Sequence, residues 1–248
     1  MKRIKVYIPA LLVICLLGVI WQVCSVSGLV APTTLPAPSQ IFQTLVNQRV
    51  VIWDNSFQTI IETLIGLALA VILGVFFGAV IFLSATLRRA FYPLLVASQT
   101  VPLIALAPLL LIWFGFGLEP KVIMVVLYCF FPITIATADG LITADQQLID
   151  LLTSMRASRS QILRTVRIPA AMPAFFSGLK ISATYAVTGA VVGEYVGASK
   201  GLGIYLQSAA HSDSINLVFA LISVIVLLSL ALVGIVLLLE KHFLAWRT

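Results

Sequence analysis

The chain alternates long apolar stretches with short polar ones, and six of the apolar stretches have the length of a membrane span. A bilayer core of about 30 Å needs roughly 20 apolar residues in one helix. Few charges interrupt these stretches, and charged or proline-rich segments bound them. We therefore predict an all-α integral membrane protein with one domain over 1–248, whose spans cover about 6–26, 57–84, 91–117, 122–138, 173–196 and 217–239.

Prolines and polar residues modify this simple pattern in two places. The 91–117 stretch is uncharged but contains Pro93, Pro102 and Pro108, so we predict a kinked or broken helix there. The proline-rich 28–54 segment is predicted to be a loop with a brief surface helix. The first stretch is too long for a signal peptide and lacks a clear cleavage site, so we predict that it is retained.

Composition supports the membrane prediction. Hydrophobic residues make up 61% of the chain and charged residues 10%, whereas soluble domains carry about 25% charged residues. A net charge of +6 would suggest nucleic acid as a partner of a soluble protein, but here membrane topology explains it first. The cysteines Cys15, Cys24 and Cys129 are odd in number and are not spaced as a metal pair, so we predict neither a metal site nor a disulfide framework.

The basic residues predict the orientation of the chain. Six spans place both termini on one side, and loops on that side hold more Lys and Arg than loops on the other. One side carries Lys2, Arg3, Lys5, Arg88, Arg89, Arg156, Arg159, Arg164, Arg167, Lys241 and Arg247, and the other carries Arg49, Lys121 and Lys200. By the positive-inside bias, both termini and the 139–172 loop are predicted to be cytoplasmic.

The 139–172 loop contains an amphipathic segment. On a single helix over 151–168, six apolar residues fall within an arc of about 120°. Arg159 intrudes on this face, so we predict a break near 157–158, and Pro169 ends the pattern. The apolar face suits either lipid headgroups or a groove of another protein, and periodicity alone does not choose between them. Its members are Leu151, Leu152, Met155, Ile162, Leu163 and Val166.

The same segment resembles a family motif. "DLLTSMRASRSQILRTVRIPAAMPAFFSGLK" is similar to the EAA loop of ABC-importer permease subunits, with 150–152 at the Glu-Ala-Ala positions and Ile168-Pro169 at the end. Arg156 stands where the family has glycine, which puts the tight turn of the loop in question. The resemblance implies that this loop couples the permease to an ATPase through Asp150, Leu151, Leu152, Met155, Arg156, Ala157, Ser158, Arg159, Ile168 and Pro169.

Further segments extend the resemblance over nearly the whole chain. "LPAPSQIF", "TVPLIALAPLLLIWFGFG" and "GEYVGASKGLG" resemble permeases of the nitrate, sulfonate, taurine and thiamine-precursor pyrimidine importers. The resemblance implies a second permease copy, two cytoplasmic ATPase subunits and an external solute-binding protein, with the permease in a bacterial plasma (inner) membrane. The chain has no Gly-x-x-x-x-Gly-Lys-Ser/Thr phosphate loop. We therefore expect no cofactor and no enzyme activity in this chain, with ATP and Mg²⁺ held by the partner.

Small residues at spacing four predict where helices approach closely. Gly66, Ala70, Gly74 and Gly78 form such a ridge in the second span, for which we favour packing within the subunit. Gly189, Gly193 and Gly197 form another in the fifth span, and the neighbouring Glu194 makes that ridge the better candidate for lining a path.

The translocation path has a set of polar candidates. A carboxylate in a membrane costs about 2.5–3.5 kcal/mol on insertion scales, so Glu62 and Glu194 require an explanation. They either face a path or gate, or lie at the interface with partial hydration. Prolines in the third span either line a cavity or serve packing. The candidates for the path are Glu62, Gln99, Pro102, Tyr185 and Glu194.

The substrate prediction rests on the resemblance and on charge. The permeases named above import either small anions or thiamine-precursor pyrimidines, and the segment 177–198 is most similar to the pyrimidine type. Two outer carboxylates would repel an anion and could hydrogen-bond an aminopyrimidine, so we predict a thiamine-precursor pyrimidine or a similar heteroaromatic solute. The alternatives are a sulfonate, taurine or nitrate in the same permease role, a secondary transporter without an ATPase, or a membrane-embedded enzyme or sensor.

Overall fold

The computed structural model describes residues 2–29, 31 and 34–247, with the backbone alone for 2–8, 10, 11 and 247, and its regular elements are all helical. The α-helices are α1 (Lys2–Val26), α2 (Pro38–Asn47), α3 (Arg49–Leu83), α4 (Ala85–Ser98), α5 (Ala107–Phe114), α6 (Glu119–Ile142), α7 (Gln146–Ser154), α8 (Arg159–Ile162), α9 (Ile168–Glu194), α10 (Leu202–His211) and α11 (Ile215–Phe243). Short turns of other helix types are η1 (Leu103–Leu106), η2 (Leu163–Arg167) and η3 (Ala245–Arg247).

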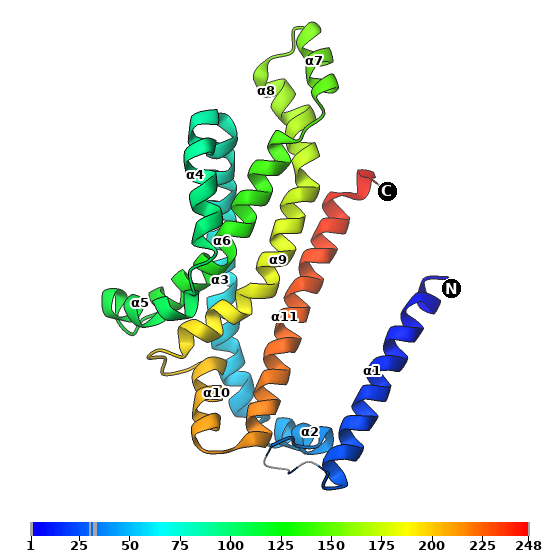
Figure 1. Cartoon of the computed structure of the whole chain (residues 1–248), viewed down its shortest axis with the longest axis vertical. Helices are drawn as coiled ribbons and strands as arrows, with labels where there is room; N and C mark the ends of the chain where they lie inside the picture. Colours follow the sequence, from blue (N-terminus) through cyan, green and yellow to red (C-terminus); the bar gives the residue numbers. More distant parts are fainter. Residues whose placement is uncertain (1, 30, 32–33, 248) are drawn as a thin grey trace.

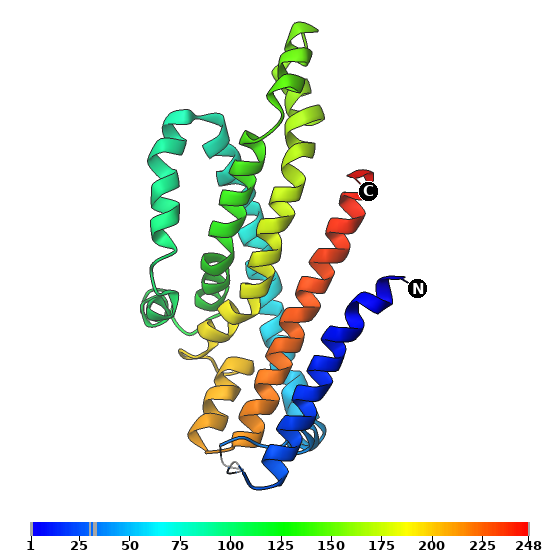
Figure 2. The ribbon, with the colours of Figure 1, turned by 45° about the vertical axis from the view of Figure 1, so that its right-hand side comes forward.

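Four long helices, α3, α6, α9 and α11, run side by side along the long axis of the molecule (Figure 1). At one end α7 and α8 project beyond them, and at the other end lie α2 and α10, as both views show (Figure 2). The chain ends of α1 and α11 point toward the α7 end. The arginine-containing segment and both termini are thus directed to the same end of the molecule.

The described residues contain fewer candidate spans than the six predicted. Among the described residues, four helical stretches are long and apolar enough to cross a membrane: Arg49–Leu83, Glu119–Ile142, Arg159–Glu194 and Ile215–Phe243. The helices Ala85–Ser98 and Leu103–Phe114 form a bent pair, and counting this pair as one span raises the number of candidate spans to five. The described apolar part of α1 is only Leu12–Val26, which is shorter than a span.

The helix boundaries also differ from the apolar stretches. The second predicted span, which was expected to start at 57, lies in α3, and α3 already begins at Arg49 because the polar residues before 57 continue its hydrogen-bonded turns. The brief surface helix expected before this span is α2. The loop predicted over 139–172 is shorter than expected, since α6 extends to Ile142 and α9 begins at Ile168. Hydropathy marks the apolar part of a helix, whereas the backbone hydrogen bonds extend beyond it.

The third predicted span is broken, as its prolines indicated. α4 ends at Ser98, and the η1–α5 unit leaves at 89° to it (Figure 1). Pro102 directly precedes η1 and cannot donate the backbone hydrogen bond that a continuous helix would need. Pro93 is accommodated inside α4, and Pro108 occupies the first turn of α5, where proline removes no intrahelical bond.

Glycines bring α6 into close contact with α3 on one side and α9 on the other. A Cβ atom on Gly74 would lie 2.7 Å from Ile133 Cγ2, and one on Gly78 would lie 2.7 Å from Thr137 Cβ. On the α9 side, a Cβ atom on Gly193 would lie 2.9 Å from the Cα atom of Lys121. Without side chains at these positions the helix backbones approach closely, which supplies packing energy where lipid offers no hydrophobic drive.

These contacts confirm intrasubunit packing for the first ridge and change the interpretation of the second. Gly66 meets Val125 of α6, in line with the other glycines of α3. Gly189 and Gly193 face Val125 and Lys121 on α6, so these two glycines pack against α6, whereas Gly197 lies beyond α9 and meets Phe116 and Leu111.

We expect Gly74→Val to destabilise the protein while Gly234→Val leaves it nearly unchanged. Added methyl groups at Gly74 would overlap Ile133, and such overpacking costs about 1–3 kcal/mol. Gly234 lies in α11 with no atom within 4 Å of its would-be Cβ, so it is a matched control in another long helix. The thermal unfolding midpoint of the purified variants in detergent measures this, and equal midpoints would contradict the packing role of Gly74.

Candidate functional site

The predicted coupling segment forms two short helices joined by a tight turn. Asp145 caps α7 by accepting a hydrogen bond from the Gln147 N–H at 2.8 Å. Ser158 caps α8 in the same way, since its hydroxyl accepts from the Gln161 N–H while its own N–H donates to the Gln161 side chain. These caps satisfy backbone groups that helix ends leave unpaired. The break expected near 157–158 is confirmed.

Arg156 adopts the backbone conformation that glycine normally supplies. Its φ angle is +58°, one of two positive values among the described non-glycine residues. The Arg156 N–H donates to Thr153 O and the Ala157 N–H donates to Leu152 O, each at 2.9 Å, which is the double hydrogen-bond pattern that ends many helices at glycine. The turn therefore forms despite the arginine, at a conformational cost of about 1–2 kcal/mol for a side chain in this region.

The apolar residues of this segment divide into a buried and an exposed group. Ile149 packs with Ala144 and Val166, and Leu152 and Ile162 lie against them. Leu148, Leu151 and Met155 are exposed instead, with 57% of Leu151 and 70% of Met155 accessible. The single apolar face predicted over 151–168 is therefore wrong, because the turn at Arg156 folds the second helix back onto the first.

Leu152 belongs to the internal group, contrary to the expectation that it faces a partner protein. The exposed group follows helical spacing at Leu148, Leu151 and Met155, so these three residues share one side of α7. This side is the surface through which the segment can contact another protein.

The remaining coupling candidates lie around this turn. Asp150 is on α7 and accepts from the Gln146 amide at 2.8 Å, and Arg159 opens α8. Pro169 does not end a helix as predicted. The Ile168 N–H bonds to Leu163 O across a π-helical turn, and Pro169 directly follows this turn inside the continuous helical stretch Arg159–Glu194.

At the opposite end of the long helices, a buried ion pair joins α3 to α6. The Lys121 ammonium lies 3.0 Å from Glu62 Oε1, and the Gln58 amide donates to the same oxygen at 2.8 Å. The Glu62 side chain is 0% exposed and that of Lys121 is 8% exposed. Burial therefore contradicts the partial hydration considered for the Glu62 side chain, and its second oxygen, Oε2, has no hydrogen-bond partner among the described residues. Lys121 was counted among the outer-loop cations, so its pairing was missed.

Glu194 is held by the start of α10. Its carboxylate accepts from the Thr59 hydroxyl at 2.6 Å and from the Gly203 N–H, and the Leu202 N–H donates to Thr59 Oγ1 at 2.9 Å. The positive end of the α10 dipole and these donors stabilise a carboxylate that is also 0% exposed. Glu194 thereby ties α9, α3 and α10 together, and a partly hydrated interfacial position is wrong for it as well.

Gln99 and Tyr185 lie in a different place from the two carboxylates. They line a cavity of about 380 Å³ beside the break that follows α4, together with Ser98, Tyr128 and Phe131. Pro102 lies in the break itself, next to Val101 and Leu103 of the lining. The five predicted path residues are thus divided: Gln99, Tyr185 and Pro102 are brought together at the cavity, and Glu62 and Glu194 are bound into the helix packing.

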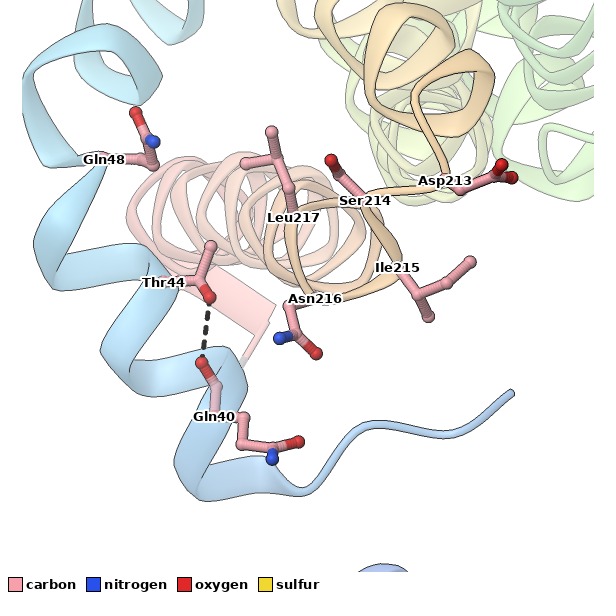
Figure 3. Close-up of a pocket in the computed structure, with 8 residues that line it drawn as sticks. All are labelled: Gln40, Thr44, Gln48, Asp213, Ser214, Ile215, Asn216 and Leu217. Atoms are coloured by element: carbon pink, nitrogen blue, oxygen red, sulfur yellow. Dashed lines mark hydrogen bonds between the residues drawn. The ribbon is translucent and has the colours of Figure 1, made fainter. Parts of the chain in front are cut away.

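A second hollow of about 480 Å³ lies at the end opposite α7 (Figure 3). It is bounded by Gln40, Thr44 and Gln48 of α2 and by 213–217, where α10 turns into α11. Thr44 donates its hydroxyl to Gln40 O at 2.9 Å, and Asp213 has a φ angle of +51° in the turn. Amides and hydroxyls of α2, Gln48, Ser214 and Asn216 thus surround this hollow, whereas Arg156, Arg159 and Arg164 lie in the segment at the α7 end.

The known proteins that this chain resembles are permease components of transport systems. The model of the family "Binding-protein-dependent transport system inner membrane component" matches residues 66–244. The chain is 37% identical over 222 residues to a probable ABC transporter permease protein of Haemophilus influenzae, covering 90% of this chain and 91% of the relative. It is 37% identical over 248 residues to the formylaminopyrimidine transport permease protein ThiX of Halalkalibacterium halodurans, covering 100% and 99%.

Other similarities are lower. The taurine transport system permease protein TauC of Escherichia coli is 30% identical over 224 residues, covering 88% of this chain and 81% of the relative. The fold is similar to that of a chain in inward-facing conformations of the MetNI methionine ABC transporter, with a TM-score of 0.64, 19% identity, and coverage of 82% of this chain and 98% of that chain.

We expect Lys121→Met to destabilise the protein by about 3–5 kcal/mol, since it leaves the buried Glu62 carboxylate without its cation. The matched control is Lys200→Met, which breaks the exposed pair with Asp54 and should cost less than about 1 kcal/mol. Adding Glu62→Gln to Lys121→Met should recover part of the loss. Unfolding in mixed detergent and denaturant reports these free energies, and equal losses for the two lysines would count against the buried pair.

Proposed function

This chain belongs to the family of binding-protein-dependent transport system inner membrane components, and we propose that it forms the translocation path of an ATP-driven importer for a small neutral heteroaromatic solute. Family membership makes it an integral, multi-pass permease without catalytic activity of its own. A secondary transporter or a membrane-embedded enzyme is therefore excluded. The observation that carries the solute proposal is the full-length similarity to a formylaminopyrimidine permease.

The partners follow from the permease role. A binding-protein-dependent importer needs an external binding protein and an ATPase, and we propose two cytoplasmic ATPase subunits that hold ATP and Mg²⁺ beneath a dimer of this chain. The arginine-containing segment and both chain ends are directed to one end of the molecule, which supports a cytoplasmic position for that end. The amide-rich end with the hollow of Figure 3 then faces the binding protein.

The coupling surface is proposed on α7. Leu148, Leu151 and Met155 form an apolar side that the rest of the chain leaves uncovered, and the caps at Asp145 and Ser158 hold the helices that present it. An amphipathic helix of this kind suits a hydrophobic groove on another protein. The projection of α7 beyond the long helices makes the side accessible to a subunit below the membrane (Figure 1).

The substrate proposal no longer depends on outer carboxylates. Glu62 and Glu194 are fully buried and paired, so they cannot repel an anion on entry. Support comes instead from the higher identity to ThiX, 37% against 30% for TauC, over a larger share of both chains. A sulfonate such as taurine is the second candidate, because TauC covers most of this chain as well.

Changing Leu151→Asp should lower ATP turnover stimulated by the binding protein about tenfold or more in the assembled complex, because docking would bury an unpaired charge. Thr153→Asp places the same charge on α7 about 160° around the helix at 100° per residue, and it should change turnover little. Turnover measured in proteoliposomes decides, and wild-type stimulation of the Leu151 variant would remove the coupling role from this side of α7.

Proteoliposomes holding the permease, its ATPase and its binding protein should take up labelled formylaminopyrimidine in an ATP-dependent manner. Labelled taurine and nitrate should not accumulate, because nothing in the proposed path offers them a counter-charge. Uptake of taurine without uptake of formylaminopyrimidine would refute the substrate and leave the permease role intact.

A further inference from the structure

The cavity beside the helix break has the size and position of a small-molecule site. Its volume of about 380 Å³ falls in the range of about 300–1,000 Å³ that ligand pockets occupy. It is enclosed by the end of α4, the start of η1, α6 and α9. Tyr128 lies nine residues after the first residue of α6, which is about 14 Å along the helix axis at 1.5 Å per residue. That is near half of a bilayer core of about 30 Å.

Polar groups at this cavity lack partners in the protein. Among the described residues, the Gln99 amide and the hydroxyls of Tyr128 and Tyr185 take part in no hydrogen bond. The carbonyls of 99–101, where α4 ends, likewise accept no backbone bond in the described part of the chain. Unpaired polar groups are costly in lipid and are tolerated where they line a space that water or a solute fills.

This lack of pairing contrasts with the rest of the membrane-embedded region. The carboxylates of Glu62 and Glu194 each have protein donors, as does the Ser182 hydroxyl, which donates to Cys129 O at 2.8 Å. Among the described residues, only Glu62 Oε2 and Thr137 Oγ1 are buried side-chain oxygens without a hydrogen-bond partner, and neither residue lines the cavity. The unpaired donors and acceptors of the cavity, by contrast, lie on its lining, where a ligand can reach them.

The lining also selects the chemistry of that ligand. None of the residues that line the cavity is charged, so neither a sulfonate nor a cation would find a counter-charge there. Neither tyrosine ring pairs with another aromatic ring among the described residues. Tyr185 is 49% exposed, and Tyr128 packs partly against the core while it lines the cavity, so both offer aromatic surface to a flat ring. One amide and two phenols can donate to and accept from ring nitrogens and amino groups.

We propose that this cavity is a binding station for a neutral heteroaromatic solute within the permease itself, with the Gln99 amide and the Tyr185 hydroxyl hydrogen-bonded to the solute and Tyr128 contacting its ring. The proposal deepens the proposed function and rests on it for the identity of the solute. The permease then selects its cargo after the binding protein has released it, and selection does not reside in the binding protein alone.

The test is equilibrium binding of labelled formylaminopyrimidine to the purified permease–ATPase complex without any binding protein. We expect saturable binding that excess unlabelled solute displaces and excess taurine does not. Gln99→Ala and Tyr185→Phe should each weaken binding about fivefold or more, as loss of a hydrogen bond to a ligand does. Tyr205→Phe removes a hydroxyl from α10, away from the cavity, and should bind as the wild type does.

Uptake by the full complex, measured in parallel, separates the two proposals. Uptake of formylaminopyrimidine without saturable binding to the wild-type permease–ATPase complex would overturn the binding station and leave the proposed function standing. If Gln99→Ala, Tyr185→Phe and Tyr205→Phe bind formylaminopyrimidine with the same affinity, the solute binds elsewhere and the assignment to this cavity is overturned. Uptake of taurine with no binding or uptake of formylaminopyrimidine would overturn both.

Discussion

The absence of hydrogen-bonding partners in lipid is the constraint on which this structure depends. Every polar group at membrane depth must pair inside the subunit or face a space that can hold water or solute. The Lys121–Glu62 pair and the Glu194 carboxylate at the start of α10 meet this demand by joining α3, α6, α9 and α10. Glycines on both sides of α6 let the backbones approach closely enough for these partners to meet. Packing and polar pairing therefore support each other.

The helix break after α4 is the place where this internal pairing is relaxed. Pro102 prevents a continuous helix, and the chain turns by 89° before it continues as α5. The backbone and side-chain groups freed by the break face a cavity and not another helix. Two rigid regions thus flank one polar opening, the bonded helix packing on one side and the η1–α5 segment on the other. Such an arrangement suits a solute path, because a path needs polar groups that remain available.

The coupling segment obeys a different constraint, since it lies beyond the long helices. Its two helices are defined by their caps, and its turn depends on Arg156 accepting a conformation that favours glycine. The small core of Ala144, Ile149 and Val166 holds the turn in place. That support allows three apolar residues of α7 to remain exposed without loss of the local fold.

The sequence by itself determined the helical membrane class, the proline break, the orientation of the arginines and the family, because apolar length, proline chemistry and charge bias are local properties. It also placed the coupling turn near 157–158. The partners of Glu62 and Glu194 were decided only by the tertiary structure, since Lys121 lies 59 residues from Glu62, and Thr59 lies 135 residues from Glu194. The same holds for α7: helical periodicity grouped Leu151 with Leu152, but the fold of α8 onto α7 buried one and left the other exposed. Local patterns specify which residues are apolar or charged, and the three-dimensional packing specifies which of them remain available to a partner.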